Sequence, residues 1–156
     1  MKTSSTSVHE LLPLLWLALG TFATGTESFM IAALLPGLAG DLSVSITAAG
    51  QLMTVFALVY ALSSPLLATA TGAMSRRKVL LLSMAAFALF NFVAAAAVNY
   101  WQLMAARILL ACAAGLYVPS ASALAGAAVS PQRRGTALAI VTGGSSVAVA
   151  LGVPKG

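Results

Sequence analysis

Long apolar blocks separated by short polar stretches make up the chain from residue 11 onwards. The first four blocks each supply the 20 or so apolar residues that a helix needs to cross a bilayer, and a fifth block runs into the end of the sequence. Because the lipid core has no water to satisfy the backbone, each block is predicted to be a helix. The predicted spans are residues 11–38, 47–71, 78–98, 101–129 and 136–156, after a cytoplasmic tail of residues 1–10.

The composition agrees with this pattern of blocks. Of the 156 residues, 60% are hydrophobic and only 7% are charged, and the mean hydropathy is +1.00. Soluble domains carry about a quarter charged residues. The sequence therefore predicts an all-α integral membrane protein. The first block is too long for a cleavable signal peptide, and no small-residue cleavage site precedes a soluble domain.

The charge and the reactive residues exclude several function classes. The net charge is +5, but the basic residues stand singly or in two short clusters between apolar blocks, which leaves no basic face for nucleic acid. One histidine, His9, and one cysteine, Cys112, cannot form a Ser-His-Asp set, an intrachain disulfide or a multi-cysteine metal site. We expect no enzyme activity, no catalytic residues and no metal.

The positions of the basic residues predict the orientation. The second connection carries Arg76, Arg77 and Lys78, and the fourth carries Arg133 and Arg134, whereas the first and third contain no lysine or arginine. Cytoplasmic connections are the ones enriched in these residues. We therefore predict a multi-pass protein of the plasma or bacterial inner membrane with a cytoplasmic N-terminus.

Two charged residues lie well inside the predicted spans. Glu27 is roughly 16 Å from the outer end of its helix and Arg107 is about 9 Å from the outer end of its own, so their depths overlap. A charge at such a depth costs on the order of 3 kcal/mol, so each should face a cavity or a partner. Small or polar residues share the two faces: Gly20, Ala23 and Thr24 beside Glu27, and Ala111, Ala114, Gly115, Pro119 and Ser122 beyond Arg107.

Each of these features also has a purely structural interpretation. Glu27 is either a proton or substrate group or a carboxylate hydrogen-bonded to Thr24 or to another helix, and Arg107 is either functional or a tether for its helix. The basic cluster of residues 76–78 sets the topology, with or without a role in gating.

Other residues in the spans are read in the same way. In the last span the small residues Gly144, Ala148, Gly152 and Gly156 recur every four residues, which favours close helix packing. Four more polar residues within the spans are candidates to line a cavity: Gln51, Tyr60, Asn91 and Tyr117.

Several short motifs carry a family resemblance. The first span contains Thr26-Glu27 and Leu34-Leu35-Pro36, and Asp41-Leu42 follows in the first connection, similar to a TE…GLLP…DL pattern. Arg107 is followed by Ala111 and Gly115, and the chain reaches Gly152-Val153-Pro154-Lys155-Gly156, similar to G-[VP]-P-x-G. From residue 12 to 156 the sequence resembles the major facilitator superfamily. Within it, the resemblance is to the twelve-span drug:proton antiporters, the chloramphenicol-resistance and arabinose-efflux-type permeases.

The second connection matches that family only in part. Its family pattern is G-x-x-x-D-R-x-G-R-[RK], and here ATATGAMSRRKVLL keeps only the basic tail. Ala68 stands at the first glycine, Gly72 at the aspartate and Ser75 at the second glycine. The resemblance at this connection therefore covers the basic residues Arg76, Arg77 and Lys78 and not the aspartate.

The resemblance implies a function and site residues. It implies proton-coupled antiport of small molecules, such as drugs or sugars, with the proton gradient as energy source and no cofactor. Its expected partners are the lipid bilayer and a small-molecule substrate. Glu27 and Arg107 would couple proton and substrate. The implied gate is Ser75, Arg76, Arg77 and Lys78, and the implied antiporter-like motif is Gly152, Pro154 and Gly156.

The resemblance also bears on completeness. The family has two six-helix halves with the substrate path between them, so we expect this chain to be an N-terminal fragment whose partner is the missing C-terminal half. The alternative is a truncated, membrane-embedded fragment with no transport activity of its own. A channel-forming oligomer has little support, because no ring of pore-lining charges is visible.

Overall fold

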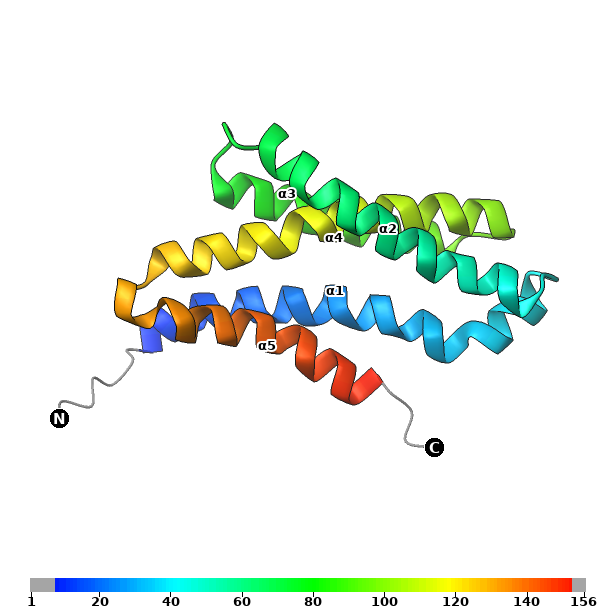
Figure 1. Cartoon of the computed structure of the whole chain (residues 1–156), viewed down its shortest axis with the longest axis horizontal. Coiled ribbons are helices and arrows are strands. Elements are labelled where there is room, and N and C mark those ends of the chain that lie inside the picture. Colours follow the sequence, from blue (N-terminus) through cyan, green and yellow to red (C-terminus); the bar gives the residue numbers. More distant parts are fainter. Residues whose placement is uncertain (1–7, 153–156) are drawn as a thin grey trace.

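The computed structural model describes residues 8–152, with the side chains of residues 12–27 and 30–150. This part of the chain is almost entirely helical and contains no strand. Successive helices run in opposite directions along one common long axis (Figure 1). The elements are α1 (Val8–Asp41), α2 (Ile46–Ala70), α3 (Arg76–Ala95), α4 (Tyr100–Ala128), the short 3-10 helix η1 (Pro131–Arg133) and α5 (Arg134–Gly152).

Four of these helices, α1 to α4, are long and apolar enough to cross a membrane. Each of the five apolar blocks coincides with one helix. Helix α5 has 19 residues in the described part of the chain, and residues 153–156 of the predicted fifth span lie outside it. The chain is thus an all-α, multi-pass membrane protein.

The ends of the helices differ from the ends of the apolar blocks. Asp41, Arg76 and Arg77 were assigned to connections, but Asp41 is the last residue of α1 and the two arginines begin α3. Residues 8–10, assigned to the tail, are helical. A span is set by apolar length, whereas a helix continues into the polar interface as long as its backbone remains hydrogen-bonded.

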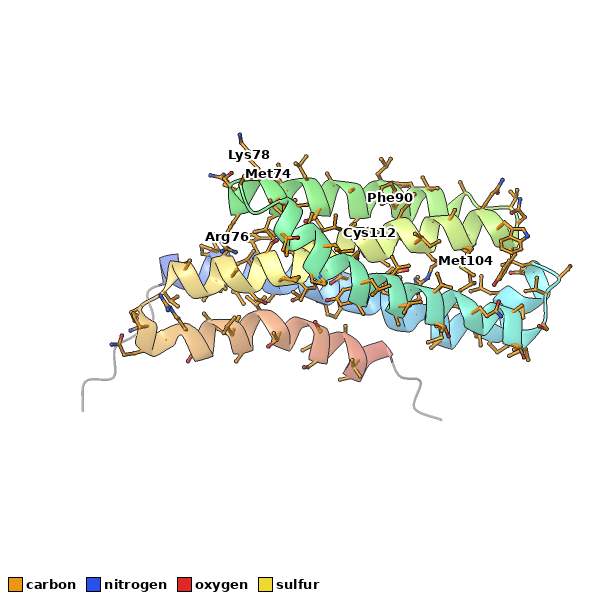
Figure 2. The ribbon with its side chains drawn as sticks, turned by 45° about the horizontal axis from the view of Figure 1, so that its top comes forward. Met74, Arg76, Lys78, Phe90, Met104 and Cys112 are labelled. Atoms are coloured by element: carbon orange, nitrogen blue, oxygen red, sulfur yellow. The ribbon has the colours of Figure 1, made fainter. Side chains whose placement is uncertain are left out.

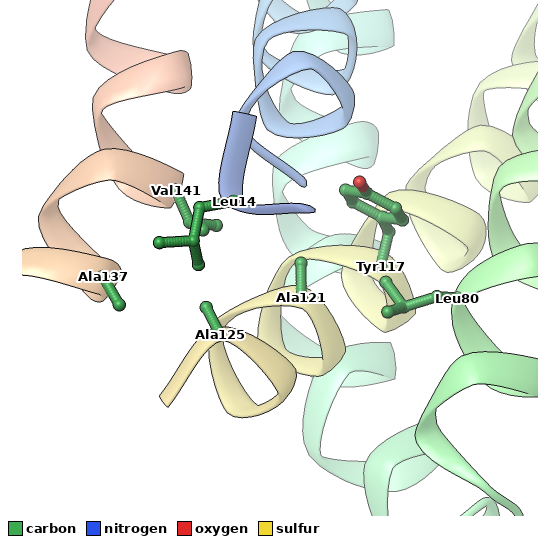
Figure 3. Close-up of a cluster of buried hydrophobic side chains, with 7 residues drawn as sticks. All are labelled: Leu14, Leu80, Tyr117, Ala121, Ala125, Ala137 and Val141. Atoms are coloured by element: carbon green, nitrogen blue, oxygen red, sulfur yellow. The ribbon is translucent and has the colours of Figure 1, made fainter. Parts of the chain in front are cut away.

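Helix α4 is the centre of the packing. It lies against α2 and α3 along much of its length and also contacts α1 and α5, while α1 packs mainly along α5. Figure 3 shows one buried cluster, in which side chains from α1, α3, α4 and α5 meet. Its members are Leu14, Leu80, Tyr117, Ala121, Ala125, Ala137 and Val141. Two of its three α4 members, Ala121 and Ala125, are alanines, which allow the helices around them to approach closely.

The α1–α5 contact depends on small residues. A Cβ atom on Gly144 would collide with the carbonyl oxygen of Ala18 and the hydroxyl of Thr21. The fully buried Thr21 hydroxyl lies within hydrogen-bond distance of the carbonyls of Ala18 and Val141. Ala148, one helical turn further, faces Gly25. The predicted packing ridge is therefore present at Gly144 and Ala148.

Large apolar side chains cover the outside of the bundle. Trp16, Leu66, Phe92 and Trp101 are each at least 65% exposed. A soluble protein rarely leaves so many large apolar side chains in water. This surface fits contact with lipid chains, and the few polar groups are concentrated inside and at the two ends.

Candidate functional site

Glu27 and Arg107 form an ion pair between α1 and α4. A guanidinium nitrogen of Arg107, Nη1, donates to Oε1 of Glu27. Glu27 is 7% exposed and Arg107 is 1% exposed, so the pair is shielded inside the bundle. The overlapping depths predicted from the sequence are thus confirmed as a direct contact.

Small residues on the neighbouring helix turns allow α1 and α4 to approach each other. The ring of Tyr117 on α4 occupies the space that a side chain at Gly20 would need, and its hydroxyl donates to the carbonyl of Leu17 at 3.2 Å. On the other side of α4, Gly115 lies against the Tyr60 carbonyl and the Ser63 side chain of α2. These contacts hold α4 between α1 and α2 and place Arg107 between them.

The guanidinium of Arg107 also contacts an aromatic ring. Its Cζ atom lies 4.3 Å from the centroid of the Phe56 ring on α2. A cation over an aromatic face is stabilised by the ring quadrupole, and more strongly so away from water. Arg107 therefore connects α1, α2 and α4 through one side chain.

Two polar atoms of the pair remain without partners. Oε2 of Glu27 and Nε of Arg107 are buried and make no hydrogen bond to the described residues. A buried donor or acceptor without a partner costs about 1–3 kcal/mol. Sites that store such a cost are often sites where a proton, water or ligand binds during function.

Cavities lie on both sides of the pair. One of about 630 Å³ lies between α1 and α3 and is lined by Glu27, Thr26 and Asn91 together with apolar side chains. The other, of about 300 Å³, lies beside Arg107 and is lined by Met53, Phe56, Ala57 and Tyr60 of α2. The ion pair thus separates a cavity on the carboxylate side from a cavity on the guanidinium side.

The predicted gate residues lie at one end of the bundle, at the start of α3, whereas the ion pair lies between α1 and α4. Only Ser75 belongs to the α2–α3 connection, and its side chain makes no capping hydrogen bond to α3. Figure 2 shows Lys78 directed away from the bundle, while Arg76 lies toward α4. Arg76 lines a cavity of about 300 Å³ together with Gly72 of the α2–α3 connection and Ser120 of α4. Arg77 lines a separate apolar groove between α1 and α3.

The structure describes only part of the predicted motif in α5. Gly152 is the last residue of the helix, and Pro154 and Gly156 lie outside the described residues. Nothing in the described part of α5 reaches the Glu27–Arg107 pair with a charged side chain.

Sequence reasoning missed two neighbours of Arg107. Phe56 and Met53 are ordinary apolar residues in the sequence, and their role depends on which face of α2 is turned toward α4. Tyr60 and Asn91 were named as cavity candidates, and each lines one of the two cavities. The one sequence signal for Phe56 is its spacing from Tyr60: residues four apart lie on the same face of a helix.

Comparison with known proteins identifies the family. The profile described as Major Facilitator Superfamily matches residues 17–156. The chain belongs to the major facilitator superfamily. This match covers all five helices of the described structure apart from the first residues of α1.

Relatives in this superfamily cover nearly the whole chain. It is 38% identical over 140 residues to the uncharacterized MFS-type transporter YbcL of Bacillus subtilis, a match covering 90% of this chain and 36% of YbcL. It is 37% identical to the chloramphenicol resistance protein of Streptomyces lividans, covering 93% of this chain and 37% of that protein. The inner membrane transport protein YdhP of Escherichia coli is 36% identical, with 91% and 36% covered.

The chain spans only a little over a third of the length of these major facilitator relatives. No solved structure matches the chain.

Proposed function

We propose that the full-length protein exports small molecules from the cell in exchange for protons, and that Glu27 is the group that binds the proton. The Glu27–Arg107 ion pair carries this proposal, because it places a carboxyl group and its countercharge away from water between two helices. Ionisable residues within membrane spans commonly mark proton or substrate pathways. The described helices would supply one side of the path, and further helices the other.

The chemistry of the pair supports coupling. When Glu27 is ionised, its Oε2 atom, which has no partner among the described residues, can accept a hydrogen bond from an N–H or O–H group of a substrate. Protonation of Glu27 removes the negative charge that strengthens this bond. A proton and a substrate therefore compete for Glu27, which is the requirement for exchange.

The relatives support export as the direction. The name of the Streptomyces lividans protein states chloramphenicol resistance, and resistance by a transporter follows from moving the compound out of the cell. This chain shares 37% of its residues with that protein over 145 residues. Chloramphenicol is accordingly the first compound to test.

The substitution Glu27→Gln tests the proposal, because glutamine keeps the shape of the side chain but cannot bind or release a proton. In inverted membrane vesicles that contain the full-length protein, an imposed pH gradient should drive chloramphenicol uptake. We expect Glu27→Gln to reduce this uptake at least tenfold. Asp41→Asn, which changes an exposed carboxylate at the end of α1, is the matched control and should transport normally.

Chloramphenicol is one compound of the possible substrates, so the same vesicles are also assayed with a panel of small drugs and sugars. If Glu27→Gln transports every compound that the unmodified protein transports, at the same gradient-driven rate, Glu27 does not bind the coupled proton and the proposal fails.

A further inference from the structure

A hydrogen bond between α1 and α4 requires the same helix alignment as the ion pair. In the ion pair, Glu27 of α1 meets Arg107 of α4. In the hydrogen bond, the Tyr117 hydroxyl of α4 donates to the Leu17 carbonyl of α1 at 3.2 Å. The two helices run in opposite directions (Figure 1), and the two contacts are separated by ten residues on each helix, or about 15 Å. One antiparallel register therefore satisfies both contacts.

The Tyr117 side chain also restricts the rotation of α1. Its ring is buried in the cluster of Figure 3 and occupies the space that a side chain at Gly20 would need. The neighbouring positions of α1, Leu19 and Thr21, both carry side chains. A rotation of α1 about its axis would bring one of these side chains against the ring. Tyr117 therefore fixes both the height and the rotation of α1 relative to α4.

The alignment of α1 with α4 depends on a small area of contact. Helix α1 packs mainly along α5, and α4 contacts α1 less extensively than it contacts α2, α3 or α5. A slip of one residue along α1 would move Glu27 by about 1.5 Å and turn it by about 100° around the helix axis. Such a slip would direct the carboxyl group away from Arg107, so the ion pair depends on the register.

The ion pair does not maintain this register by itself during the proposed exchange, because the attraction weakens whenever Glu27 takes up a proton. The hydroxyl of Tyr117 is neutral at physiological pH, so its hydrogen bond persists in both protonation states of Glu27. We propose that Tyr117 is a positioning residue: it holds α1 in register with α4 and thereby keeps Glu27 opposite Arg107 while the proton is bound and released. This inference rests on the proposed function and specifies how its site is held together.

Chemical labelling of Glu27 tests the positioning role. Dicyclohexylcarbodiimide is an apolar reagent that modifies protonated carboxyl groups, so contact with Arg107 should protect Glu27 from it. The full-length protein in lipid nanodiscs is treated at pH 7, and mass spectrometry of its peptides gives the rate of modification at Glu27. We expect Tyr117→Phe to raise this rate about fivefold, because one lost hydrogen bond shifts the balance toward the unpaired arrangement by about that factor. Arg107→Met gives the rate without protection.

Tyr100→Phe is the matched control, because it makes the same change on the same helix. The Tyr100 hydroxyl donates to the carbonyl of Ala48 at 3.1 Å, so it connects α4 to α2 and not to α1. Each variant loses a hydrogen bond from a tyrosine to a backbone carbonyl. We expect Tyr100→Phe to leave the labelling rate of Glu27 unchanged. A difference between the two variants therefore reports the alignment of α1 and not a general loss of stability.

A second variant tests the same contact from α1. Gly20→Ala places a Cβ atom where the Tyr117 hydroxyl lies, so it should displace the ring and raise the labelling rate of Glu27 as well. Gly37→Ala is its control in the same helix, since a Cβ atom at Gly37 would meet nothing within 4 Å. The control should label at the rate of the unmodified protein.

The labelling results separate the positioning role from the transport function. If Tyr117→Phe and Gly20→Ala label at the rate of the unmodified protein, the inference is wrong, whatever the gradient-driven uptake shows. It is also wrong if Tyr100→Phe raises the rate as much as Tyr117→Phe does. If Tyr117→Phe raises the rate as expected while Glu27→Gln still transports normally, the positioning role stands and the assignment of the proton to Glu27 is wrong.

Discussion

The Glu27–Arg107 pair shows what a single buried contact requires of its neighbours. Removing two charges from water is costly, and their attraction repays this cost only when geometry and further contacts are favourable. Here the Phe56 ring supplies one further contact, while Oε2 and Nε remain without partners. The packing of the surrounding helices therefore keeps the two charges in contact, and the pair alone does not account for the stability of the fold.

Removing one member of the pair should be much worse than removing both. Arg107→Met leaves the Glu27 carboxyl without its countercharge, and we expect the full-length protein to lose about 3–5 kcal/mol of stability. The double variant Glu27→Gln with Arg107→Met should recover most of that loss, because no buried charge remains. Unfolding in detergent, followed by circular dichroism, measures both.

The exposed Arg77 provides the control for this experiment, since Arg77→Met makes the same change at the start of α3. It should alter stability by less than about 1 kcal/mol. If the loss in the double variant equals the sum of the losses in the single variants Glu27→Gln and Arg107→Met, the two side chains contribute independently and the prediction is wrong.

At this scale, the sequence predicted the pair but not its surroundings. Counting residues from the ends of the spans placed Glu27 and Arg107 at overlapping depths, because depth along a helix follows from its rise per residue. The contact between Arg107 and the Phe56 ring depends on how α2 is rotated about its axis. That rotation is set by packing, and packing is not visible in one sequence.

Among the elements, α1 and α5 form a close contact in which a glycine of one helix meets the backbone of the other. Thr21, Gly25, Gly144 and Ala148 meet there, so both helices present small side chains to each other. Interfaces of this kind bring backbones close enough for van der Waals contact along several turns. The position of α1, and with it Glu27, is therefore fixed largely by its packing along α5.

Adding a single methyl group at this contact should be destabilising. Gly144→Ala places a Cβ atom against the Ala18 carbonyl and the Thr21 hydroxyl, so we expect a loss of about 1–3 kcal/mol from overpacking. Gly143→Ala, where a Cβ atom would meet nothing within 4 Å, should be neutral or up to about 1 kcal/mol stabilising through helix propensity. Thermal unfolding of both variants in detergent compares them directly.

The difference between Gly143 and Gly144 makes the result decisive. Both substitutions change the same residue type in the same helix, so insertion and helix propensity affect them equally. Equal stabilities for the two variants would contradict the close α1–α5 contact.

The elements themselves were largely predictable, while their ends were not. Apolar length identified all five blocks, because only helices satisfy the backbone in lipid. Helix ends are set by local hydrogen bonds instead. The side chains of Ser45 and Asn99 cap α2 and α4 by accepting from Ala48 N and Gln102 N, whereas Ser75 forms no such bond at α3.

Over the whole molecule, charge is distributed unequally between the two ends. The α2–α3 and α4–α5 connections lie at the end where α1 begins, and the α1–α2 and α3–α4 connections lie at the other (Figure 1). The first end has Arg76, Arg77, Lys78 and the two arginines near residue 134, and the second has Asp41. This asymmetry favours a cytoplasmic first end.

The orientation can be tested by labelling single cysteines. In a Cys112→Ser background, Asn99→Cys at the start of α4 should react with a membrane-impermeant maleimide in intact cells. Ala73→Cys, in the α2–α3 connection, should react only after the cells are opened. Both positions are exposed, so a difference in reactivity reports the side of the membrane. The opposite pattern would show an extracellular N-terminus.

The arrangement of the helices is the part that the sequence left undetermined. Alternating apolar blocks predict an up-and-down chain, but they do not say which helices are neighbours. In the structure α1 packs more extensively along α5 than along α2, and α4 lies between α2 and α3. Small residues such as Gly144 predicted that α5 packs closely against another helix, but not that this helix is α1.

The distance along the chain between Glu27 and Arg107 also sets an order of events during synthesis. The two residues are 80 positions apart, so at roughly 5–20 residues per second about 4–16 s pass between their appearance on the ribosome. During that interval α1 contains a carboxyl group whose countercharge has not yet been made. Until α4 is inserted, Glu27 therefore has to stay near water or the insertion machinery, and the first helix reaches its final place only after the fourth.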